Sequence, residues 1–137
     1  MRRFFVDTFY WIALFSRRDR WHARVAAFDA TLDATDHLYT TDEIFTEFLA
    51  YYSLATPRLR TRAARYVQAL LDTPDLTVLP QTHTGFLQAL TLYLARPDKH
   101  YSLTDCASMQ VMRQEGLTEV LTNDRHFTQE GFHILFP

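Results

Sequence analysis

The sequence predicts an α/β fold, a three-layer α/β/α sandwich whose central sheet is mainly parallel. Short apolar runs of strand length alternate along the chain with longer segments whose apolar residues recur at helical spacing. This alternation is typical of parallel strands joined by helical crossovers. The 137 residues include only three glycines and five prolines, so helices should dominate. A chain of this length usually forms one domain, here expected to span residues 1–137.

The N-terminal stretch Phe4–Thr8 predicts the first strand. Its apolar run is short, rich in β-forming residues and stops at Asp7, as in a strand that is buried on both faces. Ligands of open α/β sheets bind beyond the carboxyl ends of such strands, which makes Asp7 a candidate site residue. Residues 8–15 are apolar on nearly every side, and this predicts a helix packed between the sheet and other helices.

Helical spacing next predicts a helix over residues 21–34, and a short strand is expected at residues 37–40. Thr40 and Glu43 have the spacing of a capping box and should open the following helix. Capping does not explain Glu47, which lies one turn further on at the border of a wide apolar face. A carboxylate there costs stability unless it is paired, bound to a ligand or able to reach water at the helix edge.

Local signals also mark the later elements. Pro57 fits the first turn of a helix. Ser102 can cap another helix, whose first turn carries Asp105 where the helix dipole favours negative charge, so capping alone would account for this acid. The later helices are expected at residues 57–72, 82–96 and 102–116, the last ending at Gly116. The later strands are expected at residues 76–79, 119–122 and 132–136, with a turn or short helix at residues 125–130.

Arginines follow one side of the helix expected at residues 57–72. Arg58, Arg62 and Arg65 recur there at helical spacing. The stripe is compatible with a phosphate-facing surface, but a solvated charged face is the more common explanation and is favoured here.

Composition and charge limit the possible functions. A formal net charge of -2 gives no overall attraction to nucleic acid, so polyanion binding would need a local patch or a metal. Cys106 is the only cysteine, which excludes an internal disulfide and favours a reducing cytoplasm; its apolar neighbours predict a buried, inert thiol. Asp7 interrupts an N-terminal apolar run too short to span a bilayer, so we expect no membrane association.

Acidic residues stand where strands end or helices begin. The carboxyl ends of parallel strands meet at one edge of a sheet, so these acids should gather there and repel one another unless a cation lies between them. A divalent metal ion is therefore expected. The acids concerned are Asp7, Glu47, Asp105 and Asp124.

With these residues in place, the sequence resembles the PIN-domain family, and specifically the VapC-like ribonuclease toxins of type II toxin–antitoxin systems. Nearly the whole chain takes part in the resemblance. It is carried by four segments in the right order and spacing: Phe5–Thr8, Tyr39–Glu47, Ser102–Arg113 and Leu121–Phe132.

The resemblance implies an acidic pocket that binds Mg2+, with Mn2+ as a substitute, and hydrolyses RNA. It also implies a small cognate antitoxin as partner and a homodimer. The family's four catalytic acids match Asp7, Glu47, Asp105 and Asp124, of which Asp7, Asp105 and Asp124 are the expected metal ligands. Thr8, Ser102 and Asn123 are expected to support the pocket, whereas Arg125 and His126 are either substrate contacts or surface residues.

Two other functions are compatible with such a fold. A PIN-fold module that binds nucleic acid or acts as a scaffold without turnover would not need all the acids that this chain retains. A response-regulator-like phosphoacceptor domain needs adjacent acids after the first strand and a lysine at a strand end. Here Asp7 stands alone, and Lys99, the only lysine, falls in an expected loop. The sequence therefore favours the nuclease.

Overall fold

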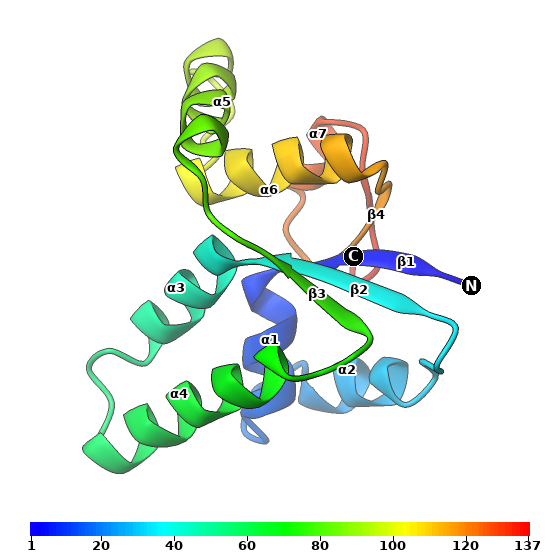
Figure 1. The fold of residues 1–137 in the computed structure, drawn as a ribbon, viewed down its shortest axis with the longest axis vertical. Helices are drawn as coiled ribbons and strands as arrows, with labels where there is room; N and C mark the ends of the chain where they lie inside the picture. The colour runs from blue at the N-terminus through cyan, green and yellow to red at the C-terminus, as the bar shows by residue number, and fades with distance from the viewer.

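The computed structural model describes all of residues 1–137, and its centre is a single sheet of five parallel strands in the order β3-β2-β1-β4-β5 (Figure 1). The chain starts in the middle of the sheet, builds outward to β3 on one side and returns to add β4 and β5 on the other. The strands are β1 (Arg3–Val6), β2 (His37–Thr41), β3 (Leu76–Leu79), β4 (Glu119–Leu121) and β5 (His133–Ile134). The predicted parallel sheet is thus confirmed.

Helices cover both faces of this sheet. In Figure 1 the first four helices lie on one side of the strands and the last three on the other, and α3 and α4 form a hairpin that extends beyond the sheet. The helices are α1 (Thr8–Phe15), α2 (His22–Asp29), α3 (Asp42–Tyr51), α4 (Pro57–Leu71), α5 (His83–Ala95), α6 (Leu103–Glu115) and α7 (His126–Gln129). The arrangement is the predicted α/β/α sandwich. No helix has both the length and the apolar character needed to cross a membrane.

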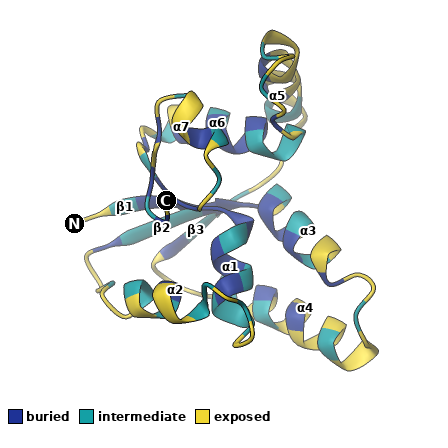
Figure 2. Cartoon of the chain, turned by 180° about the vertical axis from the view of Figure 1, so that it is seen from behind, coloured by how far each residue is buried: buried dark blue, intermediate teal, exposed yellow.

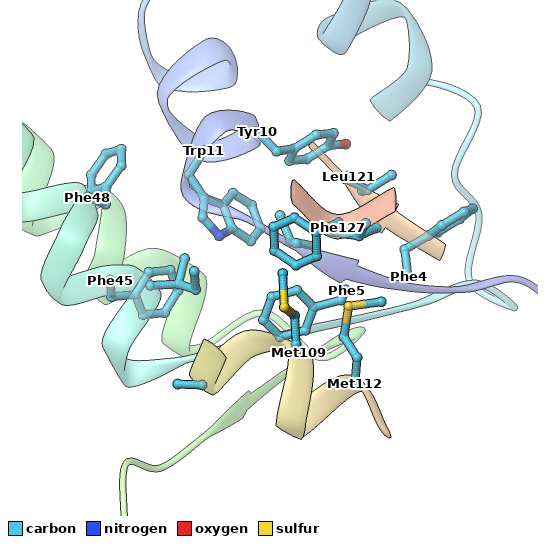
Figure 3. Close-up of a cluster of buried hydrophobic side chains, with 14 of the residues drawn as sticks. Phe4, Phe5, Tyr10, Trp11, Phe45, Phe48, Met109, Met112, Leu121 and Phe127 are labelled. Carbon is cyan, nitrogen blue, oxygen red and sulfur yellow. The ribbon is translucent and has the colours of Figure 1, made fainter. Parts of the chain in front are cut away.

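Strand β1 forms the middle of the core and is buried on both faces, as predicted. Successive side chains of a strand point to opposite faces. Phe4 packs edge-on against Phe28 of α2, with ring centroids 5.5 Å apart, whereas Phe5 points to the methionines of α6 on the other face (Figure 3). Burial on both faces fixes the position of the strand. It therefore also fixes Asp7, the residue that directly follows the strand.

Several element boundaries differ from those expected. The helix expected at residues 21–34 is only α2, and the strand expected at residues 132–136 is reduced to β5. At the C-terminus, Phe136 instead turns its ring into a cluster with Phe9 and Phe28, at centroid distances of 5.7 Å to each. The backbone stays bonded to the neighbouring strand beyond β5, because the Leu135 N–H donates to the Val120 carbonyl at 3.0 Å and the Phe136 N–H to the Thr122 carbonyl at 3.2 Å.

The capping box predicted for Thr40 and Glu43 is wrong. Strand β2 pairs with β3 through Thr41, one residue further than expected, so the helix also starts one residue later. Thr41 is the N-cap and accepts the Ile44 N–H at 3.2 Å. The Thr40 hydroxyl is committed to the sheet, because it donates to the Val6 carbonyl at 2.9 Å.

The capping signals of α6 are confirmed. The Ser102 hydroxyl accepts the Asp105 N–H, and the Asp105 carboxylate accepts the Ser102 N–H, both at 3.0 Å. The helix ends at Gly116, whose φ of 68° lies in the left-handed region that a side chain disfavours. These two residues set where α6 begins and ends, and they fix Asp105 in its first turn.

Candidate active site

Four acids from distant parts of the chain meet at the carboxyl edge of the sheet. Asp7 follows β1 and is the N-cap of α1, while Asp124 follows β4, the parallel neighbour of β1. Glu47 comes from the second turn of α3, and Asp105 from the first turn of α6. The structure thus brings together all four acids singled out in the sequence.

Asp7 is buried, with 7% of the residue exposed, and its carboxyl is held by a neighbour that the sequence did not reveal. Val6 pairs with Leu121 across β1 and β4, so the residues that follow them, Asp7 and Thr122, lie side by side. The fully buried Thr122 hydroxyl donates to Asp7 Oδ2 at 2.7 Å and accepts the Asp124 N–H at 3.1 Å. One threonine therefore joins two of the acids. Its position directly after an apolar run was the signal in the sequence.

Burial and mutual repulsion shift the acids toward their protonated forms. Burial, followed by the charges of Asp105 and Glu47, raises the pKa of Asp7 to about 7. Burial also raises the pKa of Glu47, with the charges of Asp105 and Asp124 adding to the effect. The pKa of Asp105 is raised by burial and by the charge of Asp124. The acids form one electrostatically coupled group with no cationic Lys or Arg paired to any of them.

Glu47 is tied to the first helix of the chain. The Thr8 hydroxyl, at the start of α1, donates a short hydrogen bond to Glu47 Oε1. This contact holds the Glu47 carboxylate to the start of α1, and aromatic pairs between Trp11 and Phe45 and between Phe15 and Phe48 join the same two helices. Next to Glu47, a cavity of about 320 Å³ opens between α3, α5 and α6, with Phe86 among its lining residues. A larger cavity, of about 450 Å³, lies between α2, α4 and β2 and contains none of the four acids.

Asp105, Asp124 and His126 form a second, tighter cluster. Ligand atoms from all three lie within 4.8 Å of one another. Nδ1 of His126 is 3.2 Å from Asp124 Oδ1 and 3.7 Å from Asp105 Oδ2, and it is buried with no hydrogen-bond partner. The Tyr101 ring lies edge-on to the imidazole at 5.4 Å. Carboxylate oxygens suit Mg2+ and Mn2+, and the added imidazole suits Mn2+ more than Mg2+. An orphaned nitrogen beside repelling carboxylates is what a bound cation would satisfy, so these residues fit a divalent metal.

Two residues expected at the site contribute less than the sequence indicated. Asn123 is exposed and its side chain makes no hydrogen bond. The support for Asp124 comes instead from Thr122 and from the His126 N–H, which donates to Asp124 Oδ1 at 2.9 Å. Arg125 is exposed and precedes α7 without contacting an acid.

Cys106, next to Asp105, is not a candidate nucleophile. Its side chain is fully buried. Burial, followed by the charges of Asp105 and Glu130, raises the pKa of its thiol to about 11. The thiol is therefore protonated at neutral pH and inert, as expected from its apolar neighbours.

Replacing Thr122 by Val is expected to weaken metal binding about 10–100-fold, the usual effect of removing a group that orients metal ligands. Val keeps the shape but loses the hydroxyl that holds Asp7 and Asp124. Calorimetric titration with Mn2+ measures the effect. Thr122→Ser retains the hydroxyl and should bind nearly as the natural protein does; equal binding by both variants would remove Thr122 from the site.

Comparison with known proteins places these features in context. The family model for the PIN domain matches residues 4–132. The fold is similar to that of VapC20 from Mycobacterium tuberculosis, described as a sarcin–ricin loop cleaving toxin, with a TM-score of 0.80, 26% identity and coverage of 94% of this chain and 95% of that one. FitAcB from Neisseria gonorrhoeae matches with a TM-score of 0.67, 16% identity and coverage of 96% and 95%. FitAB bound to an IR36 DNA fragment matches with a TM-score of 0.71, 17% identity and coverage of 96% of this chain and 93% of that one. A comparison with curated protein sequences gives no match.

Proposed function

Because this chain belongs to the PIN-domain family, we propose that it is a metal-dependent endoribonuclease acting as the toxin of a toxin–antitoxin pair. The observation that carries the proposal is the group of four buried or half-buried acids, three with raised pKa values, beside an unpartnered imidazole. The likeness to VapC20, a toxin that cleaves RNA of the sarcin–ricin loop, supports RNA as the substrate.

The residues divide into two roles. Asp105 and Asp124 would hold the cation, Mg2+ or in its place Mn2+, and His126 lies close enough to join them, whereas Asp7, also expected as a ligand, lies outside this cluster. A divalent cation supplies a reactive water at neutral pH and neutralises charge on the phosphodiester. Glu47 is half-buried with a raised pKa and is fixed by Thr8, so it suits the acceptance of a proton from the attacking water. Ser102 holds Asp105 through the capping box.

Cleavage assays test this function directly. The purified protein is incubated with a mixed RNA pool and, separately, with a sarcin–ricin loop hairpin, in Mg2+, in Mn2+ and in EDTA. Metal-dependent cuts should be lost in EDTA and in Asp105→Asn. If neither RNA is cut and calorimetry detects no Mg2+ or Mn2+ binding, the nuclease proposal fails and a non-catalytic PIN-fold binding module takes its place.

A small antitoxin is the proposed protein partner. The similarity to the FitAcB and FitAB structures, at 16% and 17% identity, supports the shared fold. That an antitoxin binds this chain is our proposal. Expression of this chain alone should arrest growth in the cytoplasm of a bacterial host, where its RNA substrate is found. Co-expression of a small protein encoded beside it should restore growth and co-purify with the chain.

We also propose a homodimer formed through α5. This helix contains no charged residue, packs on α6 and stands away from the sheet (Figures 1 and 2). Leu87, Leu90 and Leu94 are 49%, 36% and 71% exposed. Their spacing of three and four residues makes a stripe along the helix that can pair with its own copy about a twofold axis.

Light scattering measures the mass of the assembly. The natural chain should have twice the mass of the 16.1 kDa monomer, and Leu87→Glu combined with Leu94→Glu should yield the monomer. Leu54→Glu, at a fully exposed leucine in the turn between α3 and α4, is the matched control and should remain dimeric. A natural chain that is monomeric at all concentrations would contradict the proposal.

A further inference from the structure

A basic surface with an exposed aromatic residue lies at the end of α1. We call it the arginine–tyrosine surface and define it by Arg17, Arg18, Arg20, Tyr51 and Arg62. Two hollows of about 410 and 380 Å³ adjoin here, because Ser16, Arg18 and Tyr52 line both. The turn that carries the first three arginines is largely exposed (Figure 2).

None of the arginines of this surface is paired with an acid. Arg17, Arg18, Arg20 and Arg62 make no ion pair, and the first three make no side-chain hydrogen bond. The Arg20 guanidinium lies over the Trp21 ring, 5.7 Å from its centroid, and that of Arg62 lies over the Phe15 ring at 5.5 Å. The one acid among them, Asp19, accepts the Trp21 N–H at 2.8 Å and shapes the turn. Four unpaired cations therefore face water in a protein whose formal net charge is -2.

Two helices connect this surface to the acidic group. Thr8 of α1 and Glu47 of α3 are bonded to each other at the acids. The residues four positions later, Ile12 and Tyr51, both line the same basic hollow. Residues four apart share a helix face about one turn, or 5.4 Å, along the axis. Tyr51 thus lies about one turn from the acids, and the arginines follow at the far end of the eight-residue α1, about 12 Å along the axis from Thr8.

Tyr51 offers an aromatic face to solvent beside these charges. Tyr51 is 66% exposed, so most of its aromatic ring faces water and not the core. Proteins that bind single strands combine a cationic track for the backbone with aromatic rings on which bases stack. The arginine–tyrosine surface has both parts, next to acids suited to phosphodiester hydrolysis.

We infer that the arginine–tyrosine surface binds single-stranded RNA beside the bond to be cut, with the arginines on backbone phosphates and Tyr51 stacked on a base. The inference rests on the proposed ribonuclease function. It also divides the basic stripe of α4, because Arg62 lines the hollow whereas Arg58 and Arg65 do not.

Binding without turnover tests the inference. Fluorescence anisotropy follows a labelled 12-mer of oligoadenylate with the natural protein in EDTA over a series of salt concentrations. Arg17→Gln, Arg18→Gln and Arg20→Gln together should weaken binding about tenfold or more at low salt. They should also make the slope of log K against log salt shallower by about 2, because each lost phosphate contact on a single strand reduces the slope by about 0.7. Tyr51→Ala should weaken binding about tenfold, and Tyr51→Phe should restore it.

A matched triple variant, Arg24→Gln with Arg58→Gln and Arg65→Gln, removes the same charge outside the surface and should bind RNA as the natural protein does. In the cleavage assay the surface variants should raise KM and leave kcat nearly unchanged. Equal losses in both triple variants, unchanged binding in the surface variant, or weakened binding only to the antitoxin would each overturn the inference. Asp105→Asn tests the nuclease separately, so a failure of one proposal is distinguishable from a failure of the other.

Discussion

Replacing Asp7 by Asn should abolish RNA cleavage and, in the absence of metal, stabilise the fold at neutral pH. The loss of activity should reach about 10³-fold or more, beyond the 10–100-fold typical of groups that only orient metal ligands. The gain in stability has a separate cause. Burial is the largest contribution to the raised pKa of Asp7, about 7, followed by the neighbouring acids, so an uncharged amide is better tolerated there than a carboxylate.

The sign of the pH effect follows from this raised pKa. The folded protein keeps a proton on Asp7 up to about pH 7, whereas the unfolded chain loses it near its ordinary value of 3.8. The stability that Asp7 contributes is therefore fully present below about pH 4 and is lost as pH rises to about 7. A shift of this size corresponds to about 4 kcal/mol.

Urea unfolding in EDTA at pH 5 and pH 8 measures this difference. The natural protein should be less stable at pH 8 than at pH 5, and Asp7→Asn should remove most of that difference. The variant should exceed the natural protein in stability by more at pH 8 than at pH 5, because the loss begins above about pH 4. Added Mn2+ should restore the stability of the natural protein at pH 8 and leave the variant nearly unchanged. Equal pH dependence in the two proteins would show that Asp7 titrates normally.

The second large effect is expected at Glu130, which joins three elements beside the site. Its side chain is 4% exposed. Arg96 Nε donates to it at 2.9 Å, Arg113 Nη2 at 2.8 Å and the Tyr101 hydroxyl at 3.0 Å. Glu130→Ala should destabilise the fold by about 2 kcal/mol, less than a fully buried pair would lose, because both arginines are 40% exposed. Since Tyr101 also lies against His126, Mn2+ binding should weaken as well.

Glu130 has the opposite pH dependence to Asp7. Burial alone would raise its pKa, but hydrogen bonds from Arg113, Arg96 and Tyr101 outweigh burial and lower it below 4.5. Its stabilising contribution is therefore present above about pH 4.5 and lost as pH falls through the lowered pKa. Urea unfolding between pH 3 and pH 6 should show this acid loss in the natural protein and not in Glu130→Ala. Asp98→Ala, at an exposed carboxylate, should change stability by less than about 0.5 kcal/mol.

Local signals in the sequence were enough to locate most elements of the fold. Period and composition predicted β1, α1, α4 and β3, and the chemistry of Ser102 and Gly116 predicted the two ends of α6. Boundaries that depend on pairing were less predictable. Thr40 and Thr41 are equally good caps locally, and the pairing of Thr41 with Leu79 decides that the helix starts after the second.

The four acids could be singled out from the sequence, because Asp7 and Asp124 follow strands, Asp105 opens a helix, and Glu47 stands at the border of an apolar helix face where capping does not explain it. Their neighbours could not. Thr122 joins Asp7 and Asp124 only because β1 and β4, more than a hundred residues apart, pair in one register. His126 meets Asp105 only because α7 packs against α6. The sequence determined which residues carry the charge, and the tertiary structure decided which hydroxyls, imidazole and arginines surround it, since those contacts depend on strand register and helix packing rather than on local sequence.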